Sequence, residues 1–509
     1  MANPSAGGLL GGTVYEGYGP GRCNCRFSKT YPYAFGPRLA IAYQLSPKTV
    51  LRAGWGIVYS PSVVLDFYAG DLNGLGYNTI SFATTKFGDA AVMLKDGLSY
   101  NRSDLWAATL DPGDRPTAGQ INSPGNMVDR NAGRPGRVSQ INISLQREVL
   151  PNLAVEAAYV ANRAVWLQGR RGTGTPDDPS LVDFNALSAE RLRTFGLDIT
   201  NTGDQALLRS TIGSSLAASR GFNKLPYPGF PTTATVAQSL RPYPQFSSLP
   251  VRWAPLGNSW YDSLQVKITK RASRGLSLTS AFTWQKELGL GVESAAINNI
   301  FNRRNQKSLQ SSSTPLAFVV GFLYETPKLG NNRLVKSVIG GWAFSGTVRY
   351  QSGKPIAVPS SQNNLSSLLF QNTVMNRVPG EPLYLKDING PIDPNQDLVL
   401  NPKAWSDPAQ GQWGTSSGIY SDYRARRRPQ EEISFGRTFR LRESMRLQFR
   451  AELFNVLNRN VLNGPSSTNP LQTVTRSSKG QLTGGFGYIS TTTVGSPPRN
   501  AQLTARFEF

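Results

Sequence analysis

The last nine residues of the chain alternate between apolar and polar side chains without a break. The apolar members are Ala501, Leu503, Ala505, Phe507 and Phe509, and the polar members are Gln502, Thr504, Arg506 and Glu508. A period of two places each set on its own face of an extended strand. The segment therefore predicts a β-strand with one apolar and one polar face, which a soluble sandwich could also contain.

The segment 445–455 repeats this alternation and adds charge to the polar face. Apolar residues at every second position from 445 to 453 are separated by Arg446, Gln448, Arg450 and Glu452. Three charges on one face are too many for a dry core, but they suit a water-filled lumen. A second alternating segment ends at residue 441, and a tight turn at 442–444 joins the two segments as a hairpin.

Four further pairs of alternating segments follow the same plan. The turns that connect them are at 46–48, 150–152, 272–275 and 329–333. Strands of about 9–11 residues are long enough to cross a membrane. The series therefore predicts consecutive antiparallel hairpins with short connections.

The other connections are long and rich in Gly, Pro, Ser and Asn. They cover residues 61–137, 163–261, 286–315 and 351–431. Short periplasmic turns that alternate with long extracellular loops are typical of an outer-membrane β-barrel. Within such loops the pattern favours additional hairpins or extra strand length at 81–94 and 473–489.

The composition agrees with a barrel. Charged residues make up 17% of the chain, below the roughly 25% of soluble domains. No window has the roughly 18 consecutive apolar residues of a membrane-spanning helix. The net charge of +22 suits a polar lumen and loops that face outer-membrane lipid and anionic lipopolysaccharide. Nucleic-acid binding is not expected, because the basic residues are spread over every segment instead of forming one stripe.

The first 34 residues are interpreted as a Gly-rich loop or linker ahead of a barrel domain at 35–509, with a plug remnant as an alternative. They lack the charged and apolar regions of a secretory signal, so the chain is expected to be a mature or truncated piece. Cys23 and Cys25 are the only cysteines. Two thiols are too few for a zinc site, and a local disulfide or two free thiols both stay open.

A series of short phrases runs from residue 35 to the end of the chain. They are FGPRLAIAY at 35–43, LRAGWGIVY at 51–59, QRE at 146–148, VEAAYV at 155–160, RPYPQF at 241–246, YDSLQVK at 261–267, GGWAFSG at 340–346, QSGKP at 351–355 and RLQFRAELFNVLN at 446–458. Each phrase is weak alone. As a series they resemble the TonB-dependent receptor superfamily, most closely the Oar-like branch, whose members often carry a carboxypeptidase-regulatory-like domain before the barrel.

The resemblance implies a barrel of 22 strands around a plug. The chain accounts for about eleven to fourteen strands, so it is expected to be the C-terminal portion of such a barrel; a complete chain would have to close as a smaller barrel. The plug domain and the energy-coupling protein are implied partners that this sequence does not encode. The terminal Phe509 resembles the aromatic signal that the barrel-insertion machinery reads.

The leading hypothesis is the barrel domain of an energy-dependent receptor that takes up an unidentified solute across the outer membrane of a Gram-negative bacterium. Basic residues on the polar strand faces are candidates to attract an anionic solute. They are Lys267, Arg271, Arg349, Arg446 and Arg450. The alternative for these residues is hydration and charge pairing, for example with Glu452. The alternative function is a porin-like channel or a surface adhesion or export factor.

Catalysis, metal ions and cofactors are not expected. The chain has no histidine, which removes the commonest general base and any His-based metal or haem ligand set. The sequence contains no paired-carboxylate motif and no Ser-centred elbow. A soluble β-propeller is disfavoured, because no repeat of about 40–50 residues is present.

Overall fold

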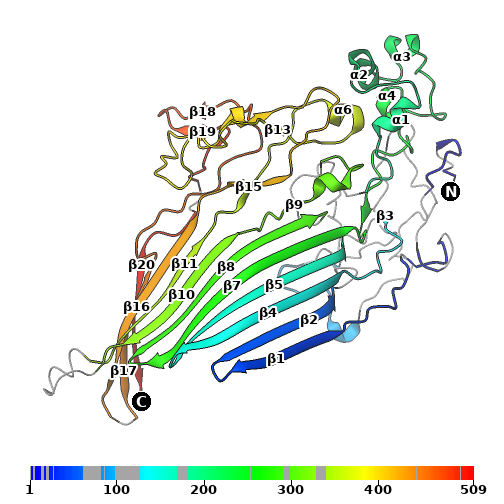
Figure 1. Cartoon of the computed structure of the whole chain (residues 1–509). Coiled ribbons are helices and arrows are strands. Elements are labelled where there is room, and N and C mark those ends of the chain that lie inside the picture. The colour runs from blue at the N-terminus through cyan, green and yellow to red at the C-terminus, as the bar shows by residue number, and fades with distance from the viewer. Residues whose placement is uncertain are drawn as a thin grey trace.

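The computed structural model consists of one large antiparallel sheet beneath a cap of folded loops (Figure 1). The structure describes residues 2–3, 6–12, 16–18, 22–26, 28–60, 82–84, 86–97, 121, 127–168, 182–252, 254–291, 298–327, 340–442, 444–492 and 495–509. In this part of the chain no helix has the length and apolar character needed to span a membrane.

Eleven strands make up the sheet, and each pairs antiparallel with the next one along the path. They are β1 (Arg38–Ser46), β2 (Thr49–Tyr59), β4 (Arg137–Leu150), β5 (Leu153–Leu167), β7 (Gly257–Ser273), β8 (Leu276–Leu290), β10 (Leu316–Glu325), β11 (Trp342–Gln351), β16 (Arg428–Arg440), β17 (Arg446–Phe454) and β20 (Asn500–Glu508). The short β9 (Ser308–Leu309) also pairs with β8. The predicted antiparallel hairpins are confirmed.

The short connections lie at one end of the sheet, where the sequence predicted them. Two-residue turns link β1 to β2, β4 to β5 and β7 to β8. In the last of these, Gly275 has a φ of 81°, and a Cβ there would collide with the backbone carbonyl of Glu325. Only glycine fits both conditions. The predicted turn at 329–333 lies outside the described residues.

Several strands extend further than the sequence indicated. β5 continues to Leu167 and β7 begins at Gly257, inside the segment predicted as a long connection. The alternation is hidden there because the otherwise apolar face carries Arg163 and Asp262, which form an ion pair of 2.7 Å across the two strands. A paired charge on that face interrupts the apolar pattern without interrupting the strand.

The sheet has one apolar and one polar face, as the alternation predicts. Large apolar side chains stand exposed on the first face, which the register keeps continuous from strand to strand. They include Leu39, Ile41, Ile143, Leu145, Leu264, Phe318, Phe344, Phe435, Phe449 and Leu503. A contiguous exposed apolar surface of this kind is what a membrane covers.

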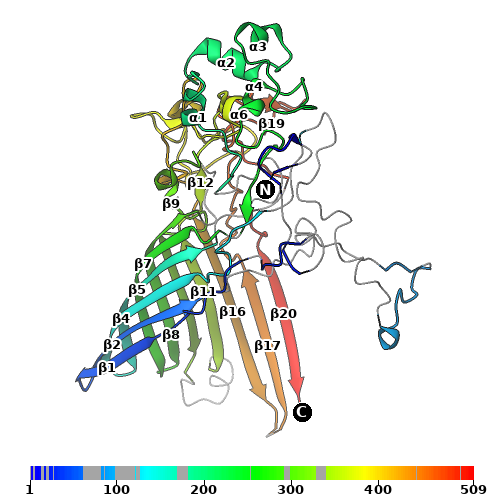
Figure 2. The ribbon, with the colours of Figure 1, turned by 90° about the vertical axis from the view of Figure 1, so that its right-hand side faces the viewer.

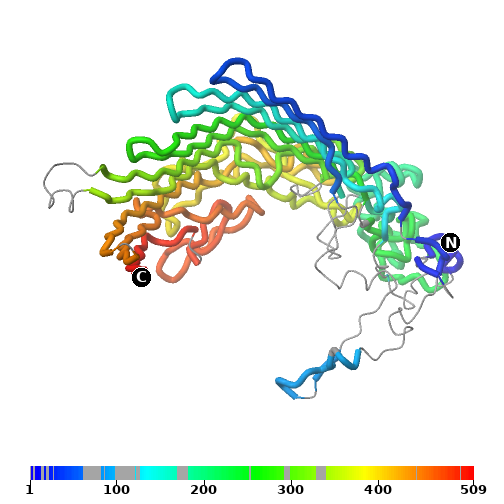
Figure 3. The backbone as a smooth tube through the Cα atoms, turned by 90° about the horizontal axis from the view of Figure 1, so that it is seen from below, coloured from blue at the N-terminus to red at the C-terminus, as the bar shows by residue number. Residues whose placement is uncertain are grey.

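The sheet curls into an open arc, which is visible when the molecule is seen from below (Figure 3). Seen from the side, β1 and β20 stand at opposite edges of the sheet (Figure 2). Ser277 of β8 and Arg450 of β17 line the same hollow although three strands lie between them. Both belong to the polar face, so the polar face is the concave one and corresponds to the lumen side of a barrel.

Among the described residues, β1 pairs with β2 alone and β20 with β17 alone. Both edge strands run from the loop end towards the turn end, because the last strand of an eleven-stranded antiparallel series has the direction of the first. Direct pairing of β1 with β20 would therefore be parallel. Closure into an all-antiparallel barrel needs an odd number of strands between them.

The described parts of the connections from β5 to β7, from β11 to β16 and from β17 to β20 form a cap at the opposite end of the sheet, and they are more ordered than predicted. The connection from β5 to β7 contains α1 (Ala189–Arg193), α2 (Thr202–Arg209), α3 (Ser215–Ser219) and α4 (Val236–Ser239). The connection from β11 to β16 contains α6 (Leu365–Leu369) and the small strands β12 (Pro355–Ala357), β13 (Asn376–Arg377), β14 (Trp405–Ser406) and β15 (Ile419–Arg424). The predicted hairpin within 473–489 is confirmed as β18 (Thr475–Arg476) and β19 (Leu482–Gly484).

The other predicted loop hairpin, at 81–94, is wrong for the residues that the structure describes. Residues 82–84 and 86–93 have no strand, and a short 3-10 helix follows at Leu94–Asp96. Between this helix and β4, the short β3 (Met127–Val128) instead pairs in parallel with β6 (Val251–Arg252), from a different loop. The signal for a local hairpin was therefore misleading here.

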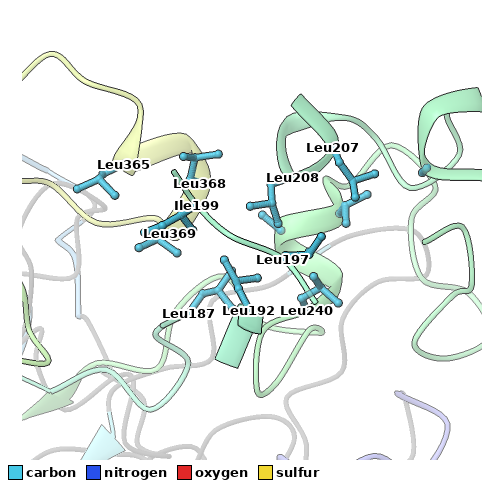
Figure 4. Close-up of a cluster of buried hydrophobic side chains, with 13 residues drawn as sticks. Leu187, Leu192, Leu197, Ile199, Leu207, Leu208, Leu240, Leu365, Leu368 and Leu369 are labelled. Carbon is cyan, nitrogen blue, oxygen red and sulfur yellow. The ribbon is translucent and has the colours of Figure 1, made fainter. Parts of the chain in front are cut away.

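A hydrophobic core holds the first part of the cap together (Figure 4). Leu207 and Leu208 of α2 are fully buried against Leu192 of α1 and against Leu368 and Leu369 of α6. Asn201 precedes helix α2, and its side chain accepts hydrogen bonds from two backbone N–H groups of the first turn, as an N-cap residue does. The core joins two different loops, and its members on α2 and α6 are more than 150 residues apart in the sequence.

A second core joins the β11–β16 connection to the β17–β20 connection. Phe486 and Ile489 of the latter pack with Val399, Leu400 and Tyr423 of the former, and all five side chains are buried. The cap is therefore a set of folded loops with cores of their own, since isolated irregular loops would leave these side chains in water.

The N-terminal residues also lie in the cap. Ala6 is buried with Ile212, Tyr227 and Phe230 of the β5–β7 connection, and the Gln245 side-chain amide donates to the Leu10 carbonyl at 2.9 Å. Cys23 and Cys25 form a disulfide, which decides between the two states that the sequence left open. The division of the chain at residue 34 stays a prediction.

Candidate functional site

The concave polar face of the sheet, called the wall below, carries the charged side chains that form the candidate site. A hollow of about 530 Å³ is formed where β8, β10, β11, β16 and β17 curve around it. Arg450 and Glu452 face this hollow and form an ion pair of 2.8 Å. Gly436 lies directly opposite Arg450 in the register, and a side chain there would crowd the Arg450 backbone and Cβ.

A second hollow, of about 540 Å³, lies nearer the loop end of the same wall. Arg349 and Arg428 line it, and the register places both on the polar face. Glu432 and Phe454 line both hollows, so the two adjoin. Glu432 accepts a hydrogen bond of 2.7 Å from the Gln430 side-chain amide.

The cations of the two hollows differ in their pairing. Arg450 forms an ion pair with Glu452. Arg349 and Arg428 are exposed and form no ion pair in the part of the chain that the structure describes. Guanidinium groups without a carboxylate partner are available to an anionic ligand, which they bind in bidentate fashion.

The structure brings together two of the five basic residues that the sequence singled out. Arg349 and Arg450 line the adjoining hollows, whereas Lys267 lies on the same face directly opposite Glu156. Arg271 is at the turn end, where its backbone N–H donates to Asn152. Arg446 is also at that end, between Arg440 and Glu508.

Arg428 is the residue that sequence reasoning missed. It ends the run Arg424-Ala-Arg-Arg-Arg428, and such a run has no alternation from which a face can be read. Only the start of β16 at Arg428 and its position opposite Gln351 place it on the polar wall.

The loops above the wall are tied to it by hydrogen bonds. The Arg424 guanidinium donates to the backbone carbonyls of Ser313, at 2.6 Å, and Gly353, at 3.1 Å. The Tyr384 hydroxyl donates to the Arg424 carbonyl at 2.8 Å. Burial lowers the pKa of Arg424 and raises the pKa of Tyr384. Both groups keep their usual charge state at neutral pH, since each begins far from it.

The described residues include no group of three or more Cys, Asp or Glu side chains that could hold a metal ion. Phe509 lies at the turn end, 92% exposed, and its ring stacks on Phe507 at 6.0 Å between centroids. Both rings belong to the apolar face, where a membrane or a partner would meet them.

A curved antiparallel sheet with an exposed apolar outer face, a charged concave face, short turns at one end and a loop cap at the other defines an outer-membrane β-barrel protein. The family model of the outer membrane beta barrel domain matches residues 2–502. The chain therefore belongs to this family, and its place is the outer membrane. No curated protein matches the sequence.

Outer-membrane receptors and a transporter are among the solved structures similar to this chain. The ferric-catecholate import receptor Fiu of Escherichia coli K12 has 10% identity and a TM-score of 0.36, covering 98% of this chain and 40% of its own. A mutant of the ferric enterobactin receptor PfeA of Pseudomonas aeruginosa has 11% identity and a TM-score of 0.38, and the match covers 93% of this chain and 40% of the receptor. The Escherichia coli transporter YddB has 8% identity and a TM-score of 0.33, and the match covers 90% of this chain and 38% of the transporter. The chain thus spans about two fifths of the length of these proteins.

Proposed function

We propose that this chain is the wall of an energy-dependent outer-membrane receptor, and that its concave face binds an anionic solute. The observation that supports the solute class is the pair of exposed, unpaired guanidinium groups of Arg349 and Arg428 in one hollow. Arg450 lies in the adjoining hollow. A cleft lined by cations raises the local concentration of anions and speeds their association.

Energy coupling rests on the sequence resemblance to TonB-dependent receptors. In this proposal a plug domain occupies the concave side, and a coupling protein of the inner membrane acts on the plug. The barrel-insertion machinery recognises the strand that ends at Phe509.

The lumen site is tested by removing both unpaired cations. In the double variant R349Q/R428Q, reconstituted in a zwitterionic bilayer, the dissociation constant for citrate is expected to rise about tenfold, which corresponds to ~1.4 kcal/mol. In a dry site, charge-assisted hydrogen bonds from two guanidinium groups contribute more free energy than this. Water in the open hollow lowers their contribution. Titration calorimetry with citrate, and with sucrose as a neutral reference, measures the effect.

The matched control removes two arginines at the turn end, in the variant R440Q/R442Q. The net charge falls by the same amount, and citrate binding is expected to stay within twofold of the parent. Equal losses in both double variants would mean that binding follows net charge, and the lumen site would then be abandoned.

A passive channel or a surface adhesion factor is the second candidate. The observation that favours it is the loop cap, whose cores give the surface a fixed shape that suits binding of a macromolecule. Liposome swelling separates a channel from a receptor: size-limited entry of neutral sugars supports a channel, and its absence supports the receptor.

A further inference from the structure

A third hollow, of about 620 Å³, lies on the opposite, convex side of the sheet at its loop end. Its floor is aromatic. Phe282, Phe318 and Tyr350 stand side by side in one row of the register across β8, β10 and β11. They are 36%, 37% and 40% exposed. The row continues the membrane-facing apolar surface up to the first residues beneath the cap.

The roof of this hollow is basic. Arg426 and Arg427 come from the segment between β15 and β16, and Arg459 comes from the connection between β17 and β20. Asn389 fixes the first two. Its side-chain oxygen accepts from the Arg427 backbone N–H at 3.0 Å, and its carbonyl accepts from the Arg426 guanidinium at 3.3 Å.

The acidic groups near the hollow are already engaged. Glu431, 3% exposed, accepts from the Arg459 guanidinium at 2.7 Å and from the Tyr350 hydroxyl at 3.0 Å. Asp387 accepts from the Asn389 backbone N–H at 2.9 Å. No carboxylate lines the hollow itself. Arg426 and Arg427 form no ion pair within the described ranges, so the roof carries two uncompensated positive charges.

A ligand for this hollow must combine a negative head with an apolar body. Arginine matches phosphate oxygens in a bidentate geometry, and basic pockets beside membrane-facing elements bind lipid head groups. The position at the loop end of the convex face is where the head groups of the outer leaflet lie. A carboxylate beneath Tyr350 disfavours a soluble anion that would enter the floor, whereas an acyl chain fits the aromatic row.

We propose that the hollow roofed by Arg426 and Arg427 is a binding site for a phosphorylated lipid of the outer leaflet. The phosphate lies between the two guanidinium groups, and the apolar part lies on Phe282, Phe318 and Tyr350. This site differs from the lumen site in its cations and in its aromatic floor, which stands on the other face of the same strands, although Gln351, Pro429 and Arg459 line both hollows at the strand ends. It does not depend on the proposed transport function.

The test uses the full chain in detergent and measures bound lipid by native mass spectrometry. The probe is bis-phosphorylated lipid A, with phosphatidylcholine and inorganic phosphate as comparisons. In the variant R426Q/R427Q the affinity for lipid A is expected to fall about 30-fold, because each cation near an anionic lipid strengthens binding by roughly fivefold. The lumen variant R349Q/R428Q, with the same charge change, is expected to keep the affinity within twofold.

The two double variants act as reciprocal controls. Loss of lipid A binding in R426Q/R427Q, together with retained lipid A binding in R349Q/R428Q, supports the lipid site whatever the fate of the lumen proposal. An equal loss in both variants shows a general charge effect and overturns the site. Equal binding of phosphatidylcholine, or binding of inorganic phosphate with the affinity of lipid A, overturns it as well.

Discussion

Replacing Ile143 by arginine is expected to lower the free energy of unfolding of the membrane-inserted sheet by about 2–4 kcal/mol. Ile143 lies in the middle of β4 on the convex apolar face and is 47% exposed. In a bilayer that exposed surface faces hydrocarbon, where a guanidinium group must stay charged and loses its water. Urea titration in phosphatidylcholine vesicles, followed by tryptophan fluorescence, gives the free energy.

The neighbouring position supplies the control. Asn142 is exposed on the concave face of the same strand, so an arginine there stays in water. N142R is expected to change the free energy of unfolding by no more than about 0.5 kcal/mol. If the two variants were destabilised equally, or N142R more, the assignment of the two faces to lipid and lumen would be wrong.

Replacing Leu368 by alanine is expected to destabilise the loop cap by about 2–5 kcal/mol, the usual cost of a Leu-to-Ala cavity in a closed core. Leu368 is fully buried in the core that α6 shares with the β5–β7 connection. The sheet should keep its stability, because its strands are held by their own ladder and by the membrane. Limited proteolysis reports opening of the cap, and the heat-modifiable migration of the folded sheet on gels reports the strands.

Ser366 lies on the same helix and is exposed, so S366A serves as the matched variant. Its cleavage rate should equal that of the parent. If the cap and the sheet opened together in L368A, the two parts would form one cooperative unit, contrary to the separate cores described above.

Much of the wall could be predicted from the sequence. Arg450 was placed on a polar strand face by the alternation around it, and the structure puts it in the lumen hollow. The same reasoning placed Arg349 correctly on that face. It could not separate these residues from Lys267, because alternation gives the face but not the position along the wall. The position depends on the register between strands that are far apart in the sequence.

The hollow on the convex face shows more clearly what the sequence could not predict. Phe282, Phe318 and Tyr350 each belong to a predicted strand, but the loop that supplies Arg426 and Arg427 had no pattern of its own. Asn389 holds that loop across almost forty residues of chain. The hollow on the convex face therefore exists only once the loop has folded back over the strand ends.

The sequence by itself determined which segments form the strands of the sheet, their two faces, the two-residue turns and the outer-membrane barrel class, because period-two alternation and turn chemistry are local properties that each segment shows alone. Tertiary structure alone decided the curvature that makes the polar face concave, the adjoining hollows with Arg349, Arg428 and Arg450, and the cores of the cap. These features come from contacts such as those of α6 with α2, between segments more than 150 residues apart. Such contacts stabilise the fold only after the sheet has brought its loops together at one end.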